Sequence, residues 1–166
     1  ADWKRPANAR DPIAILKASN RDRLPELVPV RYGRMLRSPF TFLRGSSGLM
    51  AYDLATTPTT GIRVQACGDC HLLNFGLFAT PERNLVFDLN DFDEASRLPV
   101  SIDLVRLLAS ILCAAPGLPL EPAQARAAVL EAVLAYGRAL SNGKAFWLER
   151  DTAAGAVRAL LRQVSG

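Results

Sequence analysis

The spacing of hydrophobic residues changes twice along this chain, and that change limits its fold more than any other feature. Up to about residue 61, and again from residue 99, apolar residues recur at the spacing of a helix that buries one face. Between these parts, residues 62–66 alternate apolar and polar side chains, as a half-buried strand does. Residues 76–79 and 84–88 are two short apolar runs joined by a turn that contains Pro81, which is typical of a hairpin. This order predicts an α+β fold that is mostly α, with a short β-hairpin.

Capping residues and prolines predict where the helices begin. Asp11 followed by Pro12, and Ser38 followed by Pro39, each place a capping side chain before a proline at the first helical position. Ser101 is a third capping candidate. The predicted helices span residues 11–24, 27–37, 39–54, 101–113, 121–140 and 152–164, and residues 1–10 are expected to be loose.

The composition is that of an ordinary globular domain. With 166 residues, 49% of them hydrophobic and 22% charged, the chain can bury a core and is expected to form a single domain over residues 1–166. No apolar run approaches the roughly 20 residues that a membrane-spanning helix needs. The three cysteines are too few for a secreted disulfide framework, and the first residues lack the apolar core of a signal peptide. We therefore expect a cytoplasmic protein with no membrane partner.

The net charge of +4 is unevenly distributed. Residues 1–44 hold ten basic and four acidic residues, whereas residues 45–120 hold four basic and eight acidic ones. The basic residues lack the interleaved aromatic residues of a single-strand binder, so nucleic acid is not an expected partner. Four arginines recur at spacings of three and seven and are expected to share one helix face: Arg31, Arg34, Arg37 and Arg44. They either form a solvated surface, balance the acidic residues or contact an anionic substrate.

Two clusters of acidic and amide residues carry the unusual chemistry. One occupies residues 67–74 and the other residues 88–94, and each follows a predicted strand. Phosphoryl transfer needs an acid that accepts the proton of the substrate hydroxyl, together with Asn and Asp oxygens that hold Mg²⁺ on the nucleotide phosphates. Asp69, then Asn74 five positions later, then Asp91 after the hairpin supply these groups in the order that kinases use. The three side chains are therefore expected to converge.

Longer patterns around these residues resemble a known superfamily. The two patterns are Gly68-Asp69-x-His71-x-x-Asn74 and Asn90-Asp91-Phe92-Asp93. They resemble the catalytic and metal loops of aminoglycoside-phosphotransferase-type, protein-kinase-like enzymes. Together with SPFTFLRG at 38–45 and FDLNDFDE at 87–94, they make about residues 10–140 similar to an uncharacterised bacterial domain-of-unknown-function family of that superfamily. The resemblance implies the catalytic, C-terminal lobe of a kinase-like fold, with the acidic loops on the short hairpin.

The resemblance also implies roles for the acidic cluster and a pair of cofactors. Asp69 would be the catalytic base, and Asn74 and Asp91 would be magnesium ligands, with Asp93 beside them. The cofactors would be Mg²⁺ and ATP, and the expected activity is phosphoryl transfer to an unknown small molecule.

Three further residues receive supporting roles from the same resemblance. Asp103 matches an aspartate that steadies the catalytic loop by accepting backbone N–H groups, so its side chain should turn inward. Its replacement by asparagine should then destabilise the fold more than Asp53→Asn does. His71 would orient the loop, and Arg44, inside the SPFTFLRG stretch, is the candidate for cofactor binding.

Part of a complete kinase is missing from the pattern. None of the three lysines (Lys4, Lys17 and Lys144) lies on a predicted strand, and no glycine-rich loop has the spacing that covers nucleotide phosphates. The resemblance therefore implies a fragment that carries the catalytic-loop half, with a nucleotide-gripping lobe elsewhere in a longer chain or in a partner. The alternative is a non-catalytic relic or binding module that retains the acidic loops.

Other interpretations of residues 67–74 compete with the kinase-like one. Cys67-x-x-Cys70-His71 satisfies the c-type haem attachment pattern, but only Met35 and Met50 are present as distal ligands. A thioredoxin-like pair would need a helix after the motif, and a two-metal phosphoesterase would need several histidines where the chain has one. A solvated turn rich in acids is the plainest alternative.

Overall fold

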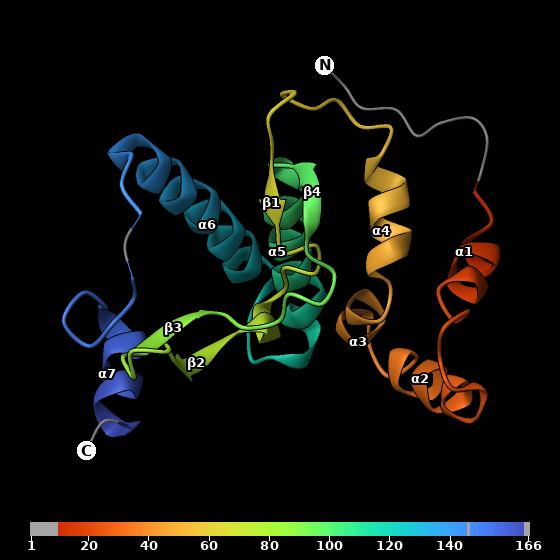
Figure 1. Ribbon diagram of the computed structural model, residues 1–166, viewed down its shortest axis with the longest axis horizontal. Coiled ribbons are helices and arrows are strands. Elements are labelled where there is room, and N and C mark those ends of the chain that lie inside the picture. The colour runs from red at the N-terminus through yellow and green to blue at the C-terminus, as the bar shows by residue number, and fades with distance from the viewer. Residues whose placement is uncertain (1–9, 146, 165–166) are drawn as a thin grey trace.

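The computed structural model describes residues 10–145 and 147–164, so the expectation for residues 1–9 lies outside the described part. Helices come first, then two separate two-stranded antiparallel sheets, and then helices again. Figure 1 shows α5 at the centre, the first four helices on one side, and the β2–β3 hairpin reaching from the centre towards α7 on the other. The α+β class with mostly helical content is confirmed.

Four short helices make up the N-terminal part: α1 (Pro12–Ala18), α2 (Val28–Met35), α3 (Pro39–Arg44) and α4 (Ser47–Leu54), with a 3₁₀ turn at Pro25–Leu27. Asp11 and Ser38 cap α1 and α3 as predicted, because their side chains accept the N–H groups of Ile13 and Thr41. The helix predicted over 39–54 is instead two helices that break at Gly45 and Ser46.

Local contacts explain this break. The Ser46 hydroxyl donates to the carbonyl of Phe42 at 2.7 Å and so competes with the helical backbone. Met35 packs so closely on Gly45 that a Cβ there would lie 2.5 Å from the Met35 Cγ. The chain therefore turns at residue 45 and begins a new helix.

The two sheets hold the acidic clusters. β2 (Phe75–Ala79) pairs with β3 (Leu85–Leu89), which confirms the predicted hairpin. β1 (Arg63–Ala66) pairs with β4 (Ser96–Pro99), a strand that the sequence did not indicate because its four residues end in proline and show little hydrophobic pattern. This pairing brings the chain on either side of both clusters together.

Three longer helices complete the fold: α5 (Ser101–Ala114), α6 (Pro122–Asn142) and α7 (Gly155–Val164). Ser101 is not the N-cap that the sequence predicted, because Val100 holds that position and makes no side-chain cap. α5 contacts α3, α4 and α6 and is the structural centre of the fold. No helix in the described part is long and apolar enough to cross a membrane.

The interior contains unusual polar groups. Leu43 on α3, Val86 on β3 and Ile102 on α5 are among the buried apolar residues. Arg106 and Ser110, one helical turn apart on α5, are nevertheless buried to 1% and 0% exposure. Because a buried charge must be paired, these two side chains point to the polar site that they support.

Candidate functional site

The loop at 67–74 leaves β1 through a conformation that only glycine adopts readily. Gly68 has φ of +85°, and a Cβ at this position would lie 2.2 Å from the carbonyl oxygen of Glu94. Positive φ and this close approach both require glycine. Gly68 thus lets the loop containing Asp69 cross closely over the end of the second acidic cluster.

Asp103 holds the start of this loop through hydrogen bonds. From the first turn of α5, its carboxylate accepts the N–H of Cys67 at 2.7 Å and the N–H of Gly68 at 3.0 Å. The side chain is half-buried and turned inward, as the sequence predicted. Two charge-assisted hydrogen bonds to consecutive N–H groups hold the start of the loop against the helix.

The remainder of the loop is also held by specific hydrogen bonds. The Ser110 hydroxyl accepts the N–H of Leu72 at 3.1 Å, and the Asn74 side-chain amide donates to the carbonyl of Asp69 at 2.7 Å. The carbonyl of Asn74 accepts the N–H of Asn90 at 3.0 Å, which links the loop to the second cluster. These bonds account for the ordered shape of the loop.

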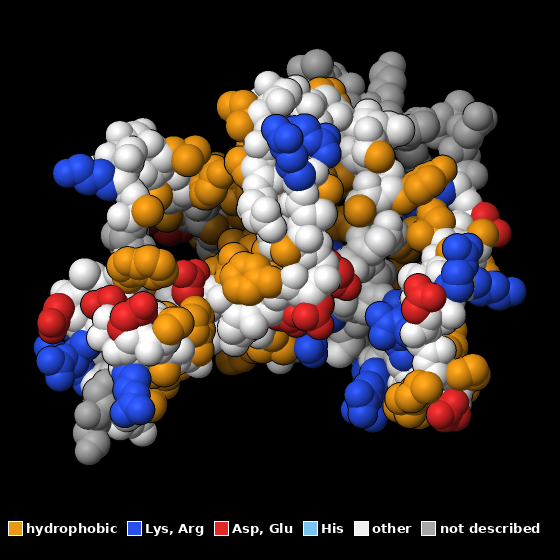
Figure 2. All heavy atoms as spheres, viewed as in Figure 1, with side chains coloured by type: hydrophobic (Ala, Val, Ile, Leu, Met, Phe, Trp, Pro, Cys, Tyr) orange, Lys and Arg blue, Asp and Glu red, His pale blue; other side chains and the backbone are white. Residues whose placement is uncertain are grey.

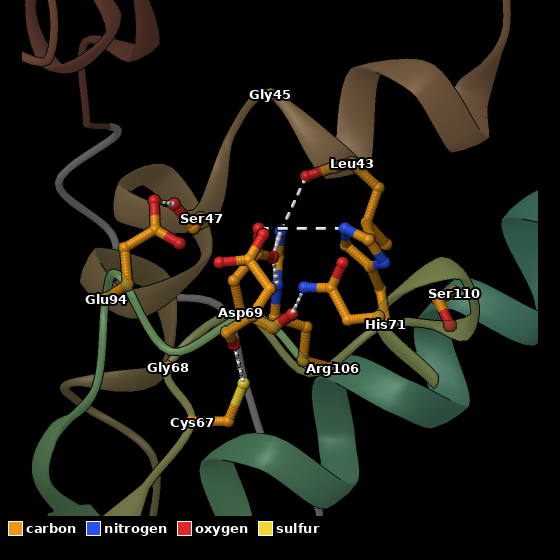
Figure 3. A network of polar contacts seen from close by, with 12 residues as sticks. Leu43, Gly45, Ser47, Cys67, Gly68, Asp69, His71, Glu94, Arg106 and Ser110 are labelled. Atoms are coloured by element: carbon orange, nitrogen blue, oxygen red, sulfur yellow. Dashed lines mark hydrogen bonds and ion pairs between the residues drawn. The ribbon is translucent and has the colours of Figure 1, made fainter. Parts of the chain in front are cut away.

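Arg106 is the functional residue that the sequence analysis missed. Its guanidinium pairs with the Oδ1 atom of Asp69, and its Nη2 donates to the carbonyl of Leu43 at 2.8 Å (Figure 3). Burial raises the pKa of Asp69, which is 9% exposed, and the charge of Arg106 opposes part of that rise. A lone arginine within the apolar run 104–108 was the signal that could have revealed it.

His71 lies beside Asp69 and is 2% exposed. Its Nε2 is 3.7 Å from the Oδ2 of Asp69 (Figure 3). Its ring also contacts that of Phe40 edge to face. Burial lowers the pKa of His71, and nearby Arg44 and Arg106 lower it further, so the imidazole is neutral at pH 7. Its Nδ1 is buried and has no hydrogen-bond partner among the described residues.

The second cluster contributes Asp91 but not Asp93. Asp91 is exposed, and the thiol of Cys67 donates to its backbone carbonyl at 3.0 Å. Asp93 is also exposed and reaches Asp91 only through its own N–H, 3.5 Å from the Asp91 Oδ1. The Asp93 side chain does not line the cleft described next, so the structure does not bring it to the other predicted ligands.

One open cleft of about 670 Å³ collects most of the predicted residues. Asp69, Asn74 and Asp91 all line it, so the structure brings the three predicted residues to one cleft. Among the other predicted residues, His71 and Arg44 line it as well, while Asp103 lies behind the loop that it fastens. The remaining wall comes from the segment 23–35 and from Thr41 and Gly45.

The cysteine pair is not built for redox chemistry. Cys67 and Cys70 are buried free thiols. Burial raises the pKa of both, that of Cys70 to about 12, which disfavours the thiolate that disulfide exchange needs. The described residues also contain no group of three His, Cys, Asp or Glu side chains placed to hold a metal ion.

A magnesium ion that is held partly by phosphates needs fewer than three protein ligands. Mg²⁺ keeps several waters and is commonly held by one or two carboxylates together with substrate phosphates. The Asn74 amide nitrogen is committed to the Asp69 carbonyl, while its Oδ1 has no donor among the described residues. Asn74 Oδ1 and the exposed carboxylate of Asp91, which line one cleft, are thus oxygen donors of the right kind.

Comparison with known proteins gives one result. No curated protein and no solved structure matches the chain. A family model described as "Uncharacterized protein conserved in bacteria (DUF2252)" matches residues 23–163, which include the whole cleft. The chain therefore belongs to this family of uncharacterised bacterial proteins.

Proposed function

We propose that the cleft is the catalytic half of a Mg²⁺- and ATP-dependent phosphotransferase that acts on a small molecule. The observation that carries this proposal is the convergence of Asp69, Asn74 and Asp91 on one cleft. The anchoring of the loop by Asp103 supports it, because a chance collection of acids would not need two backbone hydrogen bonds to hold its shape. The kinase-like resemblance supplies the reaction class, and the geometry makes the assignment testable.

In this proposal Asp69 accepts the proton of the acceptor hydroxyl. Its Oδ1 is occupied by Arg106, whereas its Oδ2 makes no hydrogen bond within the described part of the chain. Burial raises the pKa of this carboxyl, which makes it a stronger base than an exposed aspartate. Arg106 holds the carboxylate in place, and His71 packs beside it.

Asn74 and Asp91 are the residues that would hold Mg²⁺ in this proposal. When bound, the ion would neutralise charge on the nucleotide phosphates. Arg44 lines the same cleft, and its charge acts on both Asp69 and His71, so it is placed to contact a phosphate beside them. Asp93 would join these magnesium ligands only if the segment that carries it moved towards the cleft.

The proposal needs a nucleotide-gripping lobe from outside the described residues. Lys17 lies on α1 and Lys144 follows α6, so neither lies on a strand where a kinase places its phosphate-binding lysine. We propose that this lobe belongs to a longer chain or to a partner. A cytoplasmic location, where ATP is available, is part of the same proposal.

Transfer of labelled phosphate tests the function. The full-length protein is incubated with Mg²⁺ and ATP labelled at the γ-phosphate, with pooled bacterial metabolites as acceptors. Transfer to a small molecule should fall at least a hundredfold in Asp69→Asn, because general base catalysis contributes about 10²–10⁴-fold. Asp151→Asn is the matched control, since Asp151 is exposed and remote from the cleft lining. Transfer that is unchanged in Asp69→Asn would refute the proposal.

The Asp69–Arg106 ion pair favours a second candidate, a binding module without catalysis. A base whose charge is already paired is a weaker proton acceptor, so the loops could bind a ligand and do no chemistry. Nucleotide binding by the full-length protein that depends on Asp91, with no phosphate transfer or ATP hydrolysis, would favour this candidate.

A further inference from the structure

The wall of the cleft that is formed by the segment 23–35 and the end of α3 is rich in arginine. Arg23, in the turn after α1, and Arg31 and Arg34, on α2, line the cleft together with Arg44 at the end of α3. Figure 2 shows Lys and Arg side chains gathered over the region of α1 and α2. Asp22 and Glu26 belong to the same segment but do not line the cleft.

Arg31 is committed to the fold, whereas its neighbours are not. Its guanidinium donates to the side chain of Asn20 and to the carbonyl of Gly45, so it ties α2 to the turn after α3. Arg34 makes no hydrogen bond or ion pair with any described residue. Arg23 uses only its Nε, which donates to the carbonyl of Ser19 at 3.3 Å. Arg23 and Arg34 therefore line the cleft and have terminal nitrogens without a hydrogen-bond acceptor among the described residues.

The charges that line the cleft do not balance. Its four arginines face two carboxylates, and one of these, Asp69, is already paired with Arg106. The charge of Arg23 lowers the pKa of Arg31, as does burial, which shows that these like charges lie close together. An anion bound among these arginines would reduce the repulsion between Arg23 and Arg31 and would supply acceptors for the free nitrogens of Arg23 and Arg34.

We propose that Arg23 and Arg34 form a subsite for a phosphate group carried by the acceptor, so that the small molecule acted on in this cleft is itself a phosphorylated compound. This inference rests on the proposed function, because it names the substrate class of the same cleft. Guanidinium groups bind phosphate oxygens through paired N–H donors, and two arginines supply donors for more than one oxygen. The adjoining Leu24, Leu27 and Val30 are exposed in the same wall and would contact the carbon skeleton of the acceptor.

The proposal distinguishes this cleft from one that binds a cationic acceptor. A polycation such as an aminoglycoside would meet four arginines here and would be repelled by them. Arg44 stays assigned to the phosphate that is transferred, since its charge acts on both Asp69 and His71.

An NMR titration of the chain without ATP or Mg²⁺ tests the subsite. Glucose 6-phosphate and inorganic phosphate are added at low ionic strength, with glucose and kanamycin as comparison ligands. The two phosphates should shift the Nε–H signals of Arg23 and Arg34, and the two comparison ligands should not. Each of Arg34→Gln and Arg23→Gln should weaken binding of glucose 6-phosphate about tenfold, as expected for one lost charge-assisted contact. Both side chains are exposed, so the variants should keep the wild-type spectrum elsewhere.

Arg37→Gln is the matched control, because Arg37 is exposed and follows α2 but does not line the cleft. It should leave the affinity unchanged. Absence of shifts at millimolar phosphate, or equal weakening by Arg37→Gln, would overturn the proposal. It would also be overturned if Arg34→Gln weakened binding of Mg²⁺-ATP more than binding of glucose 6-phosphate, since the arginines would then serve the nucleotide. This titration measures no phosphate transfer, so its failure is separate from failure of the proposed function.

Discussion

Replacing Asp103 by asparagine tests whether the loop at 67–74 is an organised structure. The aspartate accepts two backbone N–H groups, those of Cys67 at 2.7 Å and of Gly68 at 3.0 Å. Asparagine keeps one acceptor oxygen but turns an NH₂ group towards the second N–H, which is then left without a partner. Leaving a half-buried donor unpaired costs about 1–3 kcal/mol. For a domain of this size, a loss of about 2 kcal/mol lowers Tm by roughly 4–8 °C.

Asp53→Asn is the comparison variant. Asp53 pairs with Arg10, but its side chain is 42% exposed, and surface ion pairs contribute only about 0–1 kcal/mol. Thermal unfolding followed by circular dichroism should therefore show a clearly larger loss of Tm for Asp103→Asn. Amide hydrogen exchange should also accelerate at Cys67 and Gly68, because those are the N–H groups that lose protection. Equal Tm values for the two variants, with unchanged exchange at these amides, would refute the account of the loop.

Three further predictions concern the same site. Burial lowers the pKa of His71 below 6.5, so the unfolded chain binds the proton more readily and stability should fall as pH drops below about 6.5. Urea unfolding at about pH 7.5 and 5.5 should show this loss of stability, and His71→Asn should reduce it. An equal loss in the variant would contradict the prediction. Gly68→Ala should destabilise the fold by about 2 kcal/mol or more, because Gly68 has a positive φ and a Cβ there would meet Glu94. Gly48→Ala, in an open position on α4, should be neutral or stabilising. Chemical unfolding that ranks the two variants in the reverse order would contradict this. Calorimetry should show weak or no binding of Mg²⁺-ATP to this chain alone, because no described strand carries a phosphate-binding lysine. A submicromolar Kd would contradict this, because the chain would then bind the nucleotide without a second lobe.

Local sequence signals predicted much of the secondary structure. Asp11 and Ser38 cap helices as expected, because capping depends on a side chain and on N–H groups only two or three residues away. The hairpin followed from two apolar runs and a turn. β4 was missed because its four residues gain their strand conformation from pairing with β1, some 33 residues earlier in the chain. The sequence also did not indicate the close packing of Met35 on Gly45, where the predicted helix breaks.

The candidate site was predictable only in part, for a similar reason. Asp69, Asn74 and Asp91 could be grouped because their order and spacing along the chain are those of the catalytic and metal loops of kinases. The pairing of Arg106 with Asp69 joins residues 37 positions apart and depends on how α5 packs against the loop, which no local pattern encodes. The prediction that Arg31, Arg34, Arg37 and Arg44 share one helix face is wrong, because Arg37 follows α2 and Arg44 ends α3. Only the fold shows that Arg31, Arg34 and Arg44 line the cleft while Arg37 does not.

The central claim is that Asn74 and Asp91 hold the metal of a nucleotide site beside the proposed base Asp69, and paramagnetic broadening by Mn²⁺ tests it most directly. Mn²⁺ substitutes for Mg²⁺ at oxygen ligands and broadens NMR signals from nearby nuclei. With ATP present, small additions of Mn²⁺ to the full-length protein should first broaden the Asn74 side-chain amide and the backbone amides of Asp69 and Asp91. Signals around Asp151 should persist, and Asp91→Asn should abolish the selective effect. Broadening centred away from the cleft, or a pattern unchanged in Asp91→Asn, would contradict the account.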